Sequence, residues 1–123
     1  MPHNPVIWFE IYVNDMTRAK KFYENVFEAQ LQKINPPGVE MWGFPMQMNQ
    51  VGCAGSLVKM DGVKPGGNST IVYFACEDCA VEERRSAQHG GKILKAKTSI
   101  GEYGFMSLLH DTEGNLVGLH SMK

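Results

Sequence analysis

The sequence has few cysteines, no long apolar run and no excess of charge of either sign. Three cysteines in 123 residues cannot close a disulfide framework. Twelve Lys and Arg against thirteen Asp and Glu give a formal net charge of −1, which argues against binding nucleic acid or anionic membranes through bulk charge. No apolar stretch approaches the roughly 20 residues that cross a bilayer. The opening residues also lack a basic segment followed by an apolar one. We therefore expect a cytoplasmic protein without a membrane or nucleic-acid partner.

Secondary-structure signals occur in the order strand, helix and three strands, and this order occurs twice. Residues 6–13 are rich in β-branched and aromatic side chains, which is typical of a strand. Asp15 then offers a helix N-cap. The helix after it ends near Glu28, and its apolar stripe consists of Ala19, Phe22, Tyr23 and Val26. The remaining expected elements are strands at 30–34, 40–44, 53–59, 70–76, 92–98, 103–110 and 115–120, and a helix at 79–89.

The two halves of this pattern form a repeat. Asp15 and Asp78 each stand between a strand and a helix, and they lie 63 residues apart. A Gly- and Pro-rich linker at residues 61–68 separates module 1, about residues 5–60, from module 2, about residues 69–121. The second helix matches the first only weakly: Arg85, Ser86 and His89 stand where the first has Phe22, Tyr23 and Val26. We expect one domain over residues 1–123, made of these two modules.

Two short motifs resemble those of a known family. The first is the strand–helix junction Val13-Asn14-Asp15-Met16-Thr17-Arg18-Ala19-Lys20-Lys21-Phe22-Tyr23, which is similar to V-x-D-x-x-x-(A/S)-x-x-F-Y. The second is Asp111-Thr112-Glu113-Gly114-Asn115, similar to a D-P-x-G-N hairpin with Thr in place of Pro. Both motifs are those of the vicinal oxygen chelate superfamily, which holds glyoxalase I, the bleomycin-resistance proteins and the extradiol dioxygenases. More narrowly, the chain resembles small bacterial proteins described as glyoxalase-related or lactoylglutathione lyase-related.

This resemblance implies a fold and an assembly. The fold is α+β, with two βαβββ modules forming an open barrel-like sheet around a cavity. Members of this size usually pair as homodimers, with their sites near the interface.

The resemblance also implies where a divalent metal ion would be held. The first ligand lies seven residues before the capping Asp, which is Trp8 in this sequence. Its counterpart in module 2 is Ile71, the ligand of the last strand falls on Gly118, and the remaining one falls near Ala54 or Gly55. None of these side chains binds a divalent cation. We therefore expect no metal at the family positions and no other cofactor, so that any metal would need different ligands.

Strand alternation places another set of polar side chains in the expected cavity. Glu10 shares a strand face with Trp8 and Tyr12, while Phe9, Ile11 and Val13 pack under the helix. Tyr73 lies on the corresponding face of module 2, and His120 shares that face because it follows Gly118 by two residues. The candidate catalytic residues are Glu10, Tyr73 and His120. The candidate ligand-binding residues are Trp8, Glu10, Tyr12, Trp42, Ser56, Tyr73, Tyr103 and His120.

Each of these candidates also has a plain structural interpretation. A carboxylate and an imidazole in a semi-apolar cavity can act as general acid and base, or they can orient a ligand. Glu10 can equally pair with a nearby cation, and His120 can be solvated at a strand end. Trp42 belongs to a Met- and aromatic-rich stretch, residues 41–48, that is typical of a core or dimer interface but can also line a pocket. Tyr103 belongs to a Gly-flanked loop that either closes over the cavity or only shapes a turn.

Cys76 and Cys79 form a C-x-x-C at the junction between a strand and a helix, where redox dithiols occur. Glu77 and Asp78 lie between them, and negative charge favours the thiol over the thiolate. We expect a structural pair, and two fast-reacting thiols would instead indicate a redox role.

Two classes of function follow from these observations. One is a metal-independent protein that binds a small organic molecule in the cavity. The other is an enzyme: a lyase or isomerase related to lactoylglutathione lyase, or a dioxygenase-like enzyme, using Glu10, Tyr73 and His120 or a relocated metal site.

Overall fold

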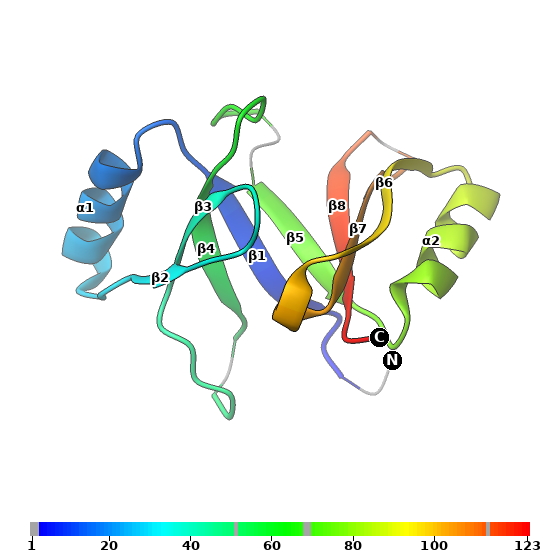
Figure 1. Ribbon diagram of the computed structural model, residues 1–123, viewed down its shortest axis with the longest axis horizontal. Coiled ribbons are helices and arrows are strands. Elements are labelled where there is room, and N and C mark those ends of the chain that lie inside the picture. The colour runs from blue at the N-terminus through cyan, green and yellow to red at the C-terminus, as the bar shows by residue number, and fades with distance from the viewer. Residues whose placement is uncertain (1–2, 51, 68–69, 113) are drawn as a thin grey trace. The chain divides into compact units, whose positions relative to one another are not determined.

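The computed structural model describes residues 3–50, 52–67, 70–112 and 114–123 (Figure 1). The chain divides into two compact units, each of which is described by itself. The first unit comprises residues 8–70, and the second comprises residues 71–123 together with the opening segment up to Ile7. Strand β1 (Val6–Tyr12) begins in that opening segment, and it belongs to the first unit from Trp8 onward.

The first unit has the order strand, helix and three strands. After β1 come α1 (Met16–Phe27), β2 (Gln32–Ile34), β3 (Glu40–Gly43) and β4 (Ala54–Lys59). The strands lie in the order β2-β3-β4-β1; β1 and β4 are parallel, and the other pairs are antiparallel. Asp15 caps α1 by accepting a hydrogen bond from the amide of Arg18 at 3.0 Å. At the other end Glu28 adopts a left-handed conformation that ends the helix.

One apolar cluster, called here the α1 cluster, holds α1 against the strands of the first unit. Its buried members are Val13, Met16, Leu31 and Leu57, and Ile11, Ala19, Tyr23, Trp42 and Phe44 pack around them. Tyr23 meets Phe44 edge to face, with 5.6 Å between ring centroids. The predicted alternation is therefore confirmed on this side, since Ile11 and Val13 pack under the helix.

The second unit repeats this order. It consists of β5 (Thr70–Ala75), α2 (Cys79–Gln88), β6 (Lys92–Ser99), a short 3₁₀ helix (Gly101–Tyr103), β7 (Phe105–His110) and β8 (Leu116–Ser121). The strands lie in the order β5-β8-β7-β6, with β5 and β8 parallel. Asp78 caps α2 by accepting from the amide of Ala80 at 3.0 Å. In Figure 1, α2 lies beside β6, β7 and β8.

A second apolar cluster, called here the α2 cluster, is centred on Cys79, Leu109 and Leu119 and packs between α2 and these strands. The buried hydroxyl of Ser121 accepts a hydrogen bond from the amide of Cys79 at 3.0 Å, which ties the start of α2 to the end of β8. Glu83 holds the other side of the helix. Its Oε1 accepts from the Ser107 hydroxyl at 2.8 Å and from the amide of Lys97 at 2.6 Å.

The predicted α+β class with two βαβββ modules is confirmed, and the differences lie at element ends. The last hairpin strands run Phe105–His110 and Leu116–Ser121, and Glu113 of the hairpin motif lies outside the described residues. Asn68 and Ser69, which were assigned to the linker and the start of module 2, also lie outside them. The strand expected from Tyr103 was wrong at its start, because Gly101–Tyr103 forms a 3₁₀ turn before Gly104 at φ 101°.

The repeat carries a one-residue shift in its last strand. Glu10 pairs with Ser56 across β1 and β4, whereas Tyr73, the residue 63 positions after Glu10, pairs with Gly118 across β5 and β8. Gly118 lies 62 positions after Ser56, so these two residues, and not Gly55 and Gly118, occupy matching places in the two units.

Among the described residues, no helix has the length and apolar character needed to cross a membrane.

Candidate functional site

Glu10 is the buried carboxylate of the first unit. It lies on β1 with 7% of its surface exposed, on the face opposite the α1 cluster. Tyr12 is two residues further along the strand, on the same face, and its hydroxyl donates to Oε1 of Glu10 at 2.8 Å. Burial, and then the charge of Glu10, raise the pKa of Tyr12 well above its ordinary value. Tyr12 is therefore a hydrogen-bond donor to Glu10 at any physiological pH.

Ser56 lies directly across from Glu10 on the parallel strand β4. Its side chain is fully buried, and among the described residues Oγ has no hydrogen-bond partner. A buried hydroxyl without a partner costs free energy, about 1–3 kcal/mol for a polar group of this kind. Glu10, Tyr12 and Ser56, called here the Glu10 cluster, thus combine a carboxylate, a phenol and a hydroxyl that is able to bond to a ligand.

The two tryptophans of the predicted site differ in position. Trp8 pairs with Ala54 and shares the Glu10 side of β1 by alternation. Trp42 pairs with Leu57 and packs in the α1 cluster, where the ammonium of Lys20 lies 3.3 Å from the centroid of its ring. The structure therefore places Trp42 on the opposite side of the sheet from Glu10. Its strand partner Leu57 faces α1, and paired residues on neighbouring strands share a face.

The predicted residues of the second unit cluster around β8. The ring of Tyr73 lies over Gly118, so closely that a methyl group on Gly118 would overlap it. His120 donates its Nε2–H to the carbonyl oxygen of Tyr103 at 2.6 Å, since a carbonyl oxygen only accepts. In a neutral imidazole this leaves Nδ1 as the acceptor. Tyr103 thus contacts His120 through its backbone.

The structure brings some of the predicted residues together within each unit. In the first unit it joins Glu10, Tyr12 and Ser56, and in the second it joins His120 to Tyr103. Tyr73 and His120 share the face opposite α2, because Phe74 and Leu119, their sequence neighbours, pack in the α2 cluster. The convergence of Glu10 with Tyr73 and His120 stays a prediction.

The residues that the resemblance assigns to a metal ion are Trp8, Ile71, Gly118 and Ala54 or Gly55, and their side chains carry no oxygen, thiolate or imidazole. The strand pairing matches Gly118 with Ser56, whose side chain offers a single hydroxyl. Elsewhere, too, the described part of the chain contains no group of three His, Cys, Asp or Glu side chains arranged to hold a metal.

The C-x-x-C cysteines lie beside the start of α2. Cys79 is fully buried in the α2 cluster, and Cys76 packs against the same cluster. Burial, and then the charge of Glu82, raise the pKa of Cys76 to about 12. The sequence predicts that Glu77 and Asp78, which lie between the cysteines, favour the neutral thiol. In the structure the charge that acts on Cys76 is that of Glu82 on α2.

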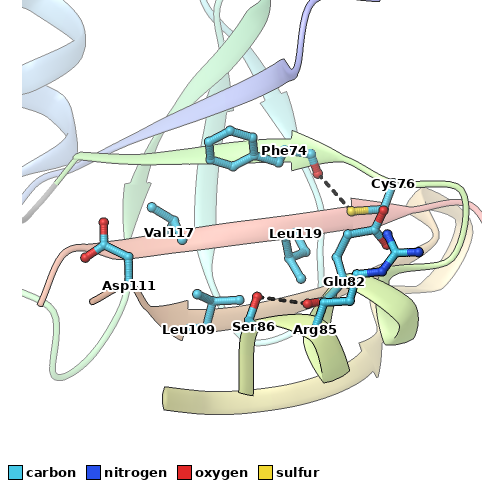
Figure 2. A pocket seen from close by; sticks show the side chains of 9 residues that line it. All are labelled: Phe74, Cys76, Glu82, Arg85, Ser86, Leu109, Asp111, Val117 and Leu119. Atoms are coloured by element: carbon cyan, nitrogen blue, oxygen red, sulfur yellow. Dashed lines mark hydrogen bonds between the residues drawn. The ribbon is translucent and has the colours of Figure 1, made fainter. Parts of the chain in front are cut away.

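Glu82 and Ser86 are not among the residues that the sequence pattern points to, yet they line a cavity of about 360 Å³ beside α2 (Figure 2). The signal that marks them is the weak apolar stripe of the second helix, where Arg85 and Ser86 replace the aromatic pair of the first. A missing ring on a helix face indicates unfilled space beneath it.

A family model identifies the relatives of this fold. The model of the Glyoxalase/Bleomycin resistance protein/Dioxygenase superfamily matches residues 6–119. The chain belongs to this superfamily. The resemblance predicted from the two motifs is thereby confirmed. No curated protein matches the sequence.

Several solved structures show the same fold at low sequence identity. A Streptomyces coelicolor methylmalonyl-CoA epimerase variant in complex with 2-nitronate-propionyl-CoA is 16% identical, with a TM-score of 0.68 and 96% of each chain covered. Methylmalonyl-CoA epimerase from Mycobacterium tuberculosis is 12% identical, with a TM-score of 0.66 over 97% of this chain and 88% of that one. A hypothetical protein from Bacillus halodurans C-125 is 12% identical, with a TM-score of 0.70 over 96% and 94%. Likeness at this level shows the fold alone.

Proposed function

We propose that this superfamily member binds a small organic molecule at the Glu10 cluster, without a metal ion or other cofactor. The observation that carries the proposal is the fully buried hydroxyl of Ser56, which has no partner among the described residues and lies across from Glu10. Such a group is satisfied when a ligand oxygen reaches it. The aromatic side chain of Trp8, on the same side of β1, would supply apolar contact.

The cluster favours a ligand with a carbonyl or hydroxyl oxygen. The Ser56 hydroxyl can donate to such an oxygen, while Tyr12 is already committed to Glu10 and holds that carboxylate in one orientation. Glu10 and Ser56 would therefore act on neighbouring atoms of the bound molecule.

The test is a binding experiment with methylmalonyl-CoA and a set of small keto acids. We expect Ser56→Ala and Glu10→Gln each to weaken binding about tenfold, the loss of roughly one buried hydrogen bond. The melting temperature of each variant should stay near that of the wild type. Isothermal titration calorimetry gives the dissociation constants, and a thermal scan gives the stabilities.

The matched control is Glu102→Gln, an exposed carboxylate of the second unit that should leave binding unchanged. A Glu10→Gln protein that loses much of its stability while binding these ligands with unchanged affinity would show that Glu10 is structural, and it would refute the proposal.

A second candidate function is proton transfer next to a carbonyl group, as in an isomerase or epimerase. The pairing of a buried carboxylate with a tyrosine donor favours it, because a held carboxylate can remove a proton from carbon and return one to the same carbon. Methylmalonyl-CoA epimerases also occur among the structural neighbours. Tyr73 and His120 would be the further acid–base groups of this enzyme; a lyase reaction, or a dioxygenase-like one on a relocated metal site, belongs to the same alternative.

Deuterium exchange separates this candidate from simple binding. If the chain is an epimerase, it should exchange the C2 proton of methylmalonyl-CoA in D₂O, and Glu10→Gln should lower that rate at least about 100-fold, the usual share of a general base. Mass spectrometry of the recovered thioester measures the exchange. Binding of methylmalonyl-CoA without exchange leaves the first function and rejects epimerisation of this thioester.

We also propose that the chain forms a homodimer, which rests on the family resemblance. That it works in the cytoplasm is a further proposal, which rests on the balanced charge of the sequence. Sedimentation equilibrium should give twice the mass of the chain at micromolar concentration. A monomer mass up to about 100 μM would contradict the dimer.

A further inference from the structure

A cavity lies between α2 and the strands of the second unit, on the opposite side of those strands from Tyr73 and His120. Its apolar wall comes from the strands: Phe74, Leu109, Val117 and Leu119 (Figure 2). Glu82 and Ser86 project from α2 toward this wall, one helical turn apart. Every residue of this cavity belongs to the second unit, so the cavity shares no residue with the Glu10 cluster.

The cavity exists because α2 lacks the ring that fills the same place beside α1. Ser86 lies 63 residues after Tyr23, the repeat distance. Tyr23 packs edge to face on Phe44 and stacks on Phe27, with centroids 5.6 and 6.1 Å away. Ser86 instead donates its hydroxyl to the carbonyl of Glu82 at 2.8 Å, within its own helix. The space that a tyrosine ring occupies in one unit is open in the other.

The polar edge of the cavity presents an acceptor that the described residues leave unsatisfied. Oε1 of Glu82 is buried and has no hydrogen-bond partner among them. The Cys76 thiol beside it donates to the Phe74 carbonyl at 3.6 Å and also interacts with the Glu82 carboxylate, which helps to raise the pKa of the thiol. Asp111, at the far end, accepts from the backbone and side-chain amides of Asn115 at 2.8 and 3.1 Å. Glu82 is therefore the group to which a bound molecule would donate.

We propose that this cavity is a second binding site, for a small planar apolar molecule that donates one hydrogen bond to Glu82. The volume of about 360 Å³ exceeds that of engineered cavities of roughly 150 Å³ that hold benzene, so a bicyclic ring is of suitable size. The four apolar side chains supply the contact area for the ligand's ring. The hydrogen bond to Glu82 orients the ligand so that its polar atom points toward α2. This site does not depend on the function proposed for the Glu10 cluster.

Indole and indene make a matched pair of probes, because they have the same shape and only indole carries an N–H. We expect indole to bind the wild type at least about tenfold more tightly than indene, with amide shift changes at Glu82, Ser86 and Leu119 in ¹H–¹⁵N spectra. Equal affinity for the two probes, or shift changes confined to other residues, would overturn the proposal.

Two substitutions on neighbouring positions of α2 locate the site. Ser86→Phe puts a ring into the cavity and should abolish indole binding, whereas Ala87→Phe adds the same ring at an exposed position and should leave it unchanged. Undiminished binding to a folded Ser86→Phe protein would refute the cavity as the site.

Substitutions at Glu82 test the hydrogen bond from the ligand to this carboxylate. They are informative even if Ser86→Phe fails to fold. Glu82→Leu should remove the preference for indole over indene, while Glu82→Gln, which keeps an acceptor oxygen, should retain it. An unchanged preference in Glu82→Leu refutes the role of Glu82. Glu10→Gln should not alter indole binding, so failure of this site and failure of the Glu10 cluster are told apart.

Discussion

The Cys76 side chain packs against the apolar cluster beside α2, near Glu82, and both surroundings favour its neutral thiol. Its pKa lies near 12, against 9.0 for a free thiol. Since the folded state holds the proton more tightly than the unfolded chain, the resulting stability is complete below pH 9 and is lost as the pH rises toward 12. Urea unfolding between pH 8 and 10.5 should show a steeper loss in the wild type than in Cys76→Ala.

The control for this titration is Cys53→Ala, which alters an exposed thiol and should keep the steep dependence. The same chemistry predicts one fast-reacting thiol at pH 8, that of Cys53, because Cys79 is buried and Cys76 stays protonated. Fast alkylation of both Cys76 and Cys79 would contradict the structural interpretation of the pair and restore a redox one.

The two helices are the elements whose stability depends most directly on single side chains. Asp15 accepts from the amide of the third residue of α1 and Asp78 from that of the second residue of α2. In the described part of the chain Asp78 also pairs with a lysine, Lys97, at 2.9 Å. That ammonium, through its hydrogen bond, lowers the pKa of Asp78. Asp15→Ala should lower the free energy of unfolding by about 1 kcal/mol, and Asp78→Ala should lower it by more.

Conservative variants separate the cap from the ion pair. Asp15→Ser and Asp78→Asn keep an acceptor for the helix amides. Denaturant unfolding should therefore place Asp15→Ser close to the wild type and Asp78→Asn between the wild type and Asp78→Ala, because Asn lacks the charge that pairs with Lys97. If Asp78→Asn is as unstable as Asp78→Ala, then the contact with Lys97 matters more than the cap.

At the level of the whole molecule, the repeat and its elements could be predicted because strand, cap and helix signals are local. Glu10 and Tyr12 were placed on one face by alternation alone. Trp42 was not, since Met41 and Trp42 make β3 apolar on both faces and only pairing with Leu57 decides between them. Tyr103 has a strand propensity that the turn at Gly104 overrides. The cavity beside α2 was missed because Ser86 in place of a ring leaves open space only where the helix does not pack closer to its strands, and the residues of the helix do not determine that by themselves.

The ring of Tyr73 over Gly118 has an evolutionary consequence. Position 118 is where the resemblance puts a metal-binding glutamate, yet any side chain there would collide with Tyr73. A glutamate at 118 therefore requires either that the Tyr73 ring moves or that a smaller residue replaces Tyr73, and the second change removes buried packing without gaining a ligand. The two positions are thus epistatic. The effect of any substitution at position 118 therefore depends on which residue stands at position 73.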